Sequence, residues 1–149
     1  MEETIILQTQ SISIGYHNKK VSSLVAKAVS IALKKGKLTA LIGANGIGKS
    51  TLLKTITGIQ TPIMGDVLLH GKNIATYNVS DLSQEMSLVL TEKLPPSNLT
   101  VYELVALGRQ PYTNWIGTLT EEDKIQVERA LSLTQISHLA DKKHYQISD

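Results

Sequence analysis

The chain has 149 residues, about the size of one domain, and its net charge of +2 and apolar content of 42% are ordinary for a globular protein. The absence of cysteine excludes disulfides and thiolate metal sites. No apolar run approaches the ~18 residues that a membrane span needs, and the acidic residues 1–4 are not expected to form a secretory signal.

The small net charge conceals an uneven distribution of charged residues. Residues 4–65 contain eight lysines and no acid, whereas the chain from Asp66 onward contains eleven acids and seven lysines and arginines. A basic half favours a polyanionic ligand. We expect no nucleic-acid partner, because few aromatic residues are interleaved with the lysines.

Strand patterns precede a glycine-rich segment. Polar and apolar residues alternate in residues 4–16 and again in residues 29–33, as they do in half-buried strands. Turn residues follow each of these runs, at 15–18 and at 34–37. A short apolar run at 38–42 predicts the strand that leads into the glycine-rich segment. The two earlier strands predict an antiparallel addition beside the sheet that contains it.

The glycine-rich segment fits the P-loop (Walker A) pattern G-x-x-x-x-G-K-[ST], in the expected place between a strand and a helix. Glycines let the backbone turn sharply, so that successive N–H groups point at an anion. The helix that follows adds its free N–H groups and the positive end of its dipole. The pattern therefore predicts a nucleotide-binding site, whose residues are Gly43, Ala44, Asn45, Gly46, Ile47, Gly48, Lys49, Ser50 and Thr51.

Three side chains of this segment have expected tasks. Lys49 is expected to reach the β- and γ-phosphates and to balance charge in the transition state. The hydroxyl of Ser50 is expected to ligate Mg²⁺. Thr51 is placed to hydrogen-bond the α-phosphate.

Shorter elements are predicted after the P-loop. The helix that begins near Gly48 should end at Gly58, a natural C-terminal stop. A strand at 66–70, a short helix at 81–85 and a buried strand at 87–90 follow.

The prolines in residues 94–97 exclude regular structure there and mark an internal boundary. Residues 1–97 are predicted to form a nucleotide-binding β/α core, and residues 98–149 a helical subdomain. Residues 100–103 fit a capping box that opens a helix. A second N-terminal signature at 120–123 opens a helix that continues to about Thr134, and a further short turn is expected at 136–140.

These features together resemble the ATP-binding subunits of ABC transporters. The resemblance is carried by Tyr16 at the end of a strand, by the P-loop, and by the spacing Gly58-x-x-x-Pro62-x-x-Gly65. Residues 99–112, with residues 117–120, are similar to the branch that serves importers of ferric siderophores, haem and cobalamin.

The resemblance implies an α/β fold of the P-loop NTPase class, with an antiparallel addition, a parallel-sheet core and the start of a helical subdomain. It implies ATP and Mg²⁺ as cofactors, with Tyr16 stacked on the adenine ring, a contact that suits an aromatic side chain. It further implies a transmembrane permease as partner, a homodimer of the ATP-binding subunits when full length, and a cytoplasmic location on the inner face of the membrane.

The sequence departs from the family pattern in two places. Thr91 and Glu92 stand where the family has a glutamine that contacts Mg²⁺ and links chemistry to the membrane subunit, so either residue is expected to substitute for it. The signature motif, the Walker B acids and the switch histidine lie further along in the family, and residues 147–149 resemble the first three residues of the signature motif. We therefore expect the full-length protein to be an ATPase and this length of chain to be inactive alone.

Two other functions stay open at this point. One is a different P-loop enzyme, a kinase or a GTPase, although the guanine-reading motif N-K-x-D is absent. The other is a truncated product that binds nucleotide or a partner without turnover.

Overall fold

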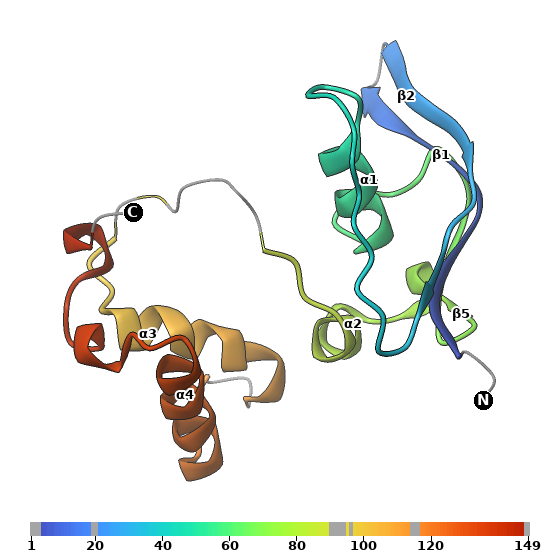
Figure 1. Cartoon of the computed structure of the whole chain (residues 1–149). Coiled ribbons are helices and arrows are strands. Elements are labelled where there is room, and N and C mark those ends of the chain that lie inside the picture. Colours follow the sequence, from blue (N-terminus) through green and yellow to red (C-terminus); the bar gives the residue numbers. More distant parts are fainter. Residues whose placement is uncertain (1–3, 19–20, 90–94, 96, 114–116, 148–149) are drawn as a thin grey trace. The chain divides into compact units, whose positions relative to one another are not determined.

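The computed structural model describes residues 4–18, 21–89, 95, 97–113 and 117–147. The chain divides into two compact units (Figure 1). The first contains the sheet and helix α1, and it comprises Met1–Leu82 together with Met86–Leu88. The second contains helices α3 and α4, and it comprises Ser83–Glu85 together with Val89–Asp149.

The first unit is built on a five-stranded sheet in the order β2-β1-β4-β5, with β3 also paired to β1. All pairings between these strands are antiparallel. This arrangement confirms antiparallel strands before the P-loop. The first continues through the residues expected to turn, and the second, expected at 29–33, is divided between the end of β2 and β3. The strands are β1 (Ile5–Asn18), β2 (Val21–Val29), β3 (Ala32–Lys34), β4 (Met64–Leu69) and β5 (Lys72–Asn73).

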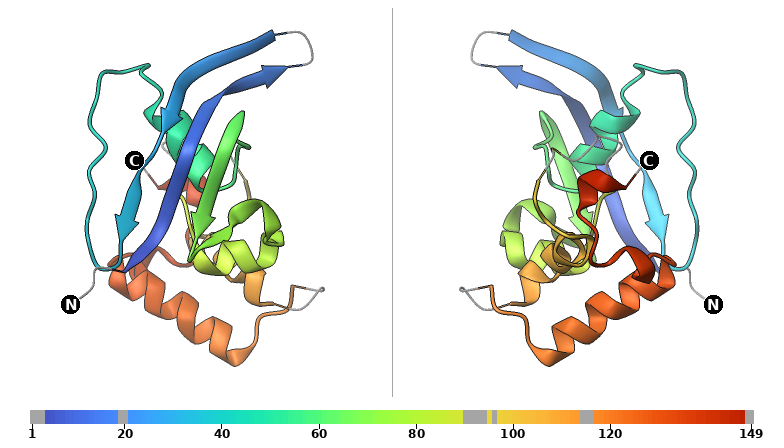
Figure 2. Two further views of the ribbon diagram at one scale, coloured as in Figure 1. Left: turned by 90° about the vertical axis from the view of Figure 1, so that its right-hand side faces the viewer. Right: turned by 90° about the vertical axis from the view of Figure 1, so that its left-hand side faces the viewer.

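The prediction of a strand at residues 38–42 was wrong. These residues have no strand pairing, and Ile42 is 90% exposed. Both views in Figure 2 show the teal stretch that leads into α1 running apart from the arrows of the sheet. A strand needs a neighbour to accept its backbone hydrogen bonds, and no described strand is paired with this segment. The strand predicted at 87–90 is likewise absent over residues 87–89, and Leu90 lies outside the described residues.

Helix α1 (Lys49–Ile56) lies against the sheet and follows the P-loop directly. Its buried face consists of Thr51, Leu52, Thr55 and Ile56, a spacing that places all four on one side of a helix. Leu52 and Ile56 belong to the same core as the sheet residues Leu7, Ile12, Ile14, Val67 and Leu69. The predicted end of the helix is confirmed, because Thr57 caps it and Gly58 adopts a φ of +77°.

The remaining helices confirm most of the expected elements. Helix α2 (Val79–Glu85) covers the predicted short helix. Helix α3 (Val101–Ala106) and helix α4 (Glu121–Leu133) both begin with capping boxes, at Thr100 and Thr120. Short 3-10 helices complete the structure: η1 (Ile74–Thr76), η2 (Leu107–Tyr112), η3 (Ser137–Leu139) and η4 (His144–Gln146).

The second unit has a small core of its own, centred on Val101, Val127 and Leu131. Within the part of the chain that the structure describes, no helix has the length and apolar character needed to cross a membrane.

Candidate functional site

The P-loop adopts a tight conformation that depends on two glycines. Gly46 and Gly48 have φ values of +80° and +107°, which L-residues rarely adopt. Gly48 is also the N-cap of α1, and a Cβ atom there would lie 2.3 Å from Cγ1 of Val25 on β2. The loop can therefore pass close to β2 only because this residue has no side chain.

Lys49 bends back over its own loop. Its Nζ atom donates hydrogen bonds to the carbonyl oxygens of Gly43 and Ala44, both at 2.7 Å. The ammonium group is thus held inside the curve of the loop, on the side where α1 begins. No acidic residue occupies the first turn of α1. The positive end of the helix dipole and the lysine charge therefore act together, and both favour an anion.

A pocket of about 350 Å³ opens beside the loop, a volume within the range of small-molecule sites. Tyr16 reaches it from β1, and its Oη atom lies 3.1 Å from Oγ1 of Thr51. The Tyr16 residue is 57% exposed, so an aromatic surface is available at the pocket. The lining residues are Tyr16, Val25, Asn45, Gly46, Gly48, Lys49, Ser50 and Thr51.

The structure thus brings Tyr16 together with most of the P-loop, although 35 positions separate Tyr16 from Thr51. Gly43 and Ala44 do not line the pocket, but they hold Lys49 through their carbonyl oxygens. The Ile47 side chain lies outside it and is largely exposed. Thr91 and Glu92, expected at the glutamine position, lie outside the described residues.

Sequence reasoning missed Val25 as a pocket residue. Val25 lies on β2, a strand that the alternation of residues 29–33 did not predict. Only the pairing of β1 with β2, which places Tyr16 opposite Ser23, brings this strand to the pocket.

A larger cavity of about 560 Å³ lies elsewhere in the first unit, lined by Gly15 and by residues 59–63. None of the described residues that line it is charged. The smaller pocket combines a lysine, hydroxyl groups, a helix N-terminus and an aromatic ring, and it is therefore the better candidate for binding an anionic ligand.

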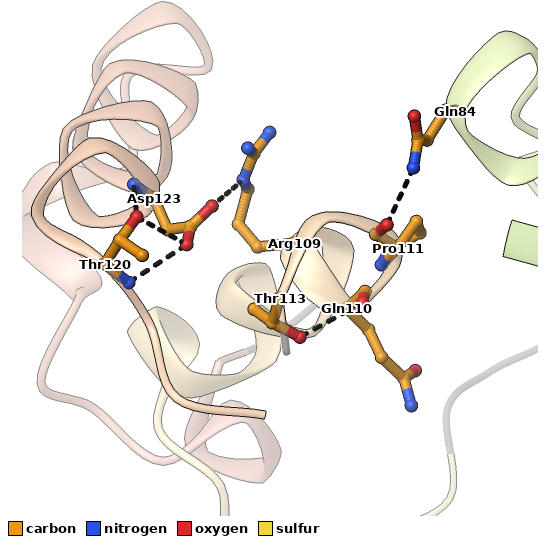
Figure 3. A network of polar contacts seen from close by, with 7 residues as sticks. All are labelled: Gln84, Arg109, Gln110, Pro111, Thr113, Thr120 and Asp123. Carbon is orange, nitrogen blue, oxygen red and sulfur yellow. Dashed lines mark hydrogen bonds and ion pairs between the residues drawn. The ribbon is translucent and has the colours of Figure 1, made fainter. Parts of the chain in front are cut away.

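A polar network in the second unit surrounds Asp123, which is buried (Figure 3). Its carboxylate accepts hydrogen bonds from the Thr120 N–H at 3.0 Å and the Thr120 hydroxyl at 2.8 Å, and one from Nε of Arg109 at 2.9 Å. The hydrogen bonds from Thr120 have the largest effect and the one from the Arg109 guanidinium the next largest, and together they hold the pKa of Asp123 below its ordinary value. Gln84 donates a separate hydrogen bond to the carbonyl oxygen of Pro111 at 2.8 Å.

Replacing Asp123 by asparagine should lower the unfolding temperature of the chain at neutral pH. A carboxyl group whose pKa is lower in the folded chain stabilises it above the unfolded pKa of about 3.9, and this contribution is lost as the pH falls through the folded pKa. Circular dichroism melts of wild type and D123N at pH 7 and at lower pH should therefore converge in acid. E122Q removes an exposed charge from the same helical turn and serves as the control. A difference between wild type and D123N that persists unchanged into strong acid would contradict this account.

Known proteins resemble this chain over most of its length. The sequence model of the family described as ABC transporter matches residues 26–149. An uncharacterized ABC transporter ATP-binding protein of Methanocaldococcus jannaschii is 39% identical over 144 residues, which are 97% of this chain and 48% of that protein. The iron(3+)-hydroxamate import ATP-binding protein of Bacillus subtilis is 37% identical over 136 residues, which are 91% of this chain and 49% of that protein. The chain spans about half the length of the curated relatives it matches.

A solved structure agrees with these sequence relatives. A nucleotide-free ATP-binding cassette from an ABC transporter superposes with a TM-score of 0.76 and 29% identity, over 97% of this chain and 60% of that one. The family match covers most of the chain, including the P-loop, the second unit and the first unit from residue 26 onward. This chain therefore belongs to the ABC transporter family and has the fold of an ATP-binding cassette.

Proposed function

We propose that this chain binds Mg-ATP as part of the ATPase subunit of an ABC importer. The observation that carries this proposal is the pocket in which Tyr16 from β1 meets Lys49, Ser50 and Thr51 from the P-loop and α1. An aromatic ring on one side and an anion-binding helix N-terminus on the other match the two ends of a nucleoside triphosphate.

The residues present fit both expected cofactors. The curve of the loop would hold the triphosphate through backbone N–H groups and Lys49, and the ring of Tyr16 would stack on adenine. Ser50 has an exposed side chain at the pocket wall and would contribute its hydroxyl oxygen to Mg²⁺, a ligand type that this hard cation prefers. The metal ion would neutralise negative charge on the phosphates.

Hydrolysis is proposed for the full-length protein. None of the described residues that line the pocket is an aspartate or a glutamate, the residue types that hold Mg²⁺ through water or orient an attacking water molecule. Thr91 and Glu92 remain candidates for the position that the family fills with glutamine. Family membership decides against the kinase and GTPase alternatives.

The transported substrate and the partners are proposed from the relatives. The Bacillus subtilis relative is named for iron(3+)-hydroxamate import, and we propose an iron chelate or a related cofactor as the cargo of this system. The full-length protein would then pair with a second copy and bind a transmembrane permease at the cytoplasmic face of the membrane.

The ring of Tyr16 is tested by comparing Y16F with Y16L. Neither variant has the hydroxyl group, so the comparison isolates the aromatic face. Y16L should bind Mg-ATP about two- to tenfold more weakly than Y16F, because stacking contributes about 0.5–1.5 kcal/mol. Both variants should bind inorganic triphosphate equally well, since it has no base. Isothermal titration measures all four affinities, and equal ATP affinities would remove Tyr16 from the adenine site.

A further inference from the structure

The contact between Tyr16 and Thr51 joins the two ends of the pocket. Tyr16 belongs to β1 and Thr51 to the first turn of α1, and their hydroxyl oxygens are 3.1 Å apart. Thr51 is the residue expected at the α-phosphate, while Tyr16 is the residue expected at the base. One hydrogen bond therefore connects the residue expected at the base with the residue expected at the α-phosphate.

The backbone around Tyr16 is held from two sides. Tyr16 pairs with Ser23 on β2, and the strands approach so closely at the preceding residue that a Cβ on Gly15 would lie 2.1 Å from the Ser23 carbonyl oxygen. On the other side, the side-chain amide of Gln60 donates a hydrogen bond to the Gly15 carbonyl oxygen. Both contacts restrict the position from which the Tyr16 side chain extends.

Thr51 is fixed as firmly. Only 5% of the residue is exposed, and its carbonyl oxygen accepts a hydrogen bond from the hydroxyl of Thr55 at 2.8 Å. Thr55 is itself fully buried, on the face of α1 that packs against the sheet. The Tyr16–Thr51 bond therefore connects two anchored groups, and its geometry is set by the fold around it.

The chemistry of the two hydroxyl groups assigns a direction to this bond. A hydroxyl has one hydrogen to donate and can accept through its lone pairs. The phenol is the more acidic of the two and the better donor. With Tyr16 donating, the Thr51 oxygen is the acceptor, and the Thr51 hydrogen is left to donate to an anionic oxygen. Consecutive hydrogen bonds of this kind polarise one another, so each becomes stronger.

We propose that Tyr16 is a positioning residue for the phosphate site, and that its hydroxyl orients the Thr51 hydroxyl toward the phosphate chain. This inference rests on the proposed nucleotide-binding function and deepens it. It assigns to Tyr16 a role that does not depend on the base, in addition to the stacking of its ring.

The test uses inorganic triphosphate with Mg²⁺, a ligand that contains no base. Wild type, Y16F, T51V and the double variant are titrated as the full chain. Y16F should bind triphosphate about three- to tenfold more weakly than wild type, the size expected for loss of one hydrogen bond. The double variant should bind no more weakly than T51V alone, because the tyrosine acts through the threonine hydroxyl. T51S retains that hydroxyl, and the loss caused by Y16F should reappear in the T51S background.

Three results would contradict the proposal in different ways. Equal triphosphate affinities of wild type and Y16F would overturn the positioning role and leave the P-loop assignment intact. Full additivity of Y16F and T51V would also overturn it, because the tyrosine would then act independently of Thr51. If wild type failed to bind triphosphate, the proposed function and this inference would both be overturned. Unfolding temperatures of all variants show whether an affinity loss comes from the fold, and Y16F, which removes one oxygen atom, keeps the test decisive if T51V is unstable.

Discussion

Replacing Lys49 by alanine is expected to weaken the binding of Mg-ATP roughly ten- to a hundredfold. The substitution removes the ammonium group that the structure holds inside the loop, 2.7 Å from the carbonyl oxygens of Gly43 and Ala44. A hydrogen bond to a charged group is worth about 1.5–3 kcal/mol, and each 1.4 kcal/mol corresponds to about a tenfold change in affinity. Isothermal titration of the full chain with Mg-ATP measures the loss.

A matched control comes from the same helix. Lys54 lies in the last turn of α1 and does not line the pocket, so K54A removes the same charge from the same element. We expect its affinity to stay within about twofold of wild type, because this charge lies at the opposite end of α1 from the pocket and is screened by salt. Equal losses in both variants would show that Lys49 acts only through the overall charge of the chain, and unchanged affinity in K49A would remove the P-loop from the binding site.

Replacing Gly48 by alanine is expected to disrupt the loop. A φ of +107° costs an L-residue about 1–2 kcal/mol, and the new Cβ would lie 2.3 Å from Cγ1 of Val25, an overlap that costs a further ~1–3 kcal/mol when the backbone shifts to relieve it. The shift displaces the N–H groups at the start of α1. Mg-ATP affinity should fall roughly tenfold or more, with a lower unfolding temperature.

Two further variants separate the overlap from the backbone strain. Gly71 has a φ of +79° and no atom within 4 Å of the position of an added Cβ, so G71A introduces strain alone, away from the pocket. It should lower stability without lowering ATP affinity. In the G48A background, V25A removes the overlapping Cγ1 and leaves the nearest remaining atom at 3.7 Å, and part of the affinity should return. Failure of V25A to restore any affinity would show that contact with β2 does not determine the loop conformation.

Local signals predicted the helices well. The capping boxes at Thr100 and Thr120 each involve residues three positions apart, so all the groups that form them lie within one helical turn. The end of α1 at Gly58 has the same origin, because a glycine adopts a positive φ at low cost. These interactions need no knowledge of the rest of the fold.

Strands depended on partners that are distant in sequence. The apolar run at 38–42 is of a kind that can form a strand, yet no described strand is paired with it. Conversely, β2 forms although its alternation is weak, because β1 supplies the hydrogen-bonding partner. Apolar periodicity indicates that a segment can pair as a strand. Whether it does so depends on the segment that folds beside it.

The candidate site likewise has one part that the sequence predicted and another that only the tertiary structure decided. The sequence alone predicted the P-loop, because its glycines, lysine and serine lie within one short run of the chain. The tertiary structure alone decided that Val25 lies against Gly48 and that the Tyr16 hydroxyl contacts Thr51. Both contacts depend on the register between β1 and β2 and on the packing of α1 against the sheet, and a shift of one residue in that register would turn these side chains to the opposite face.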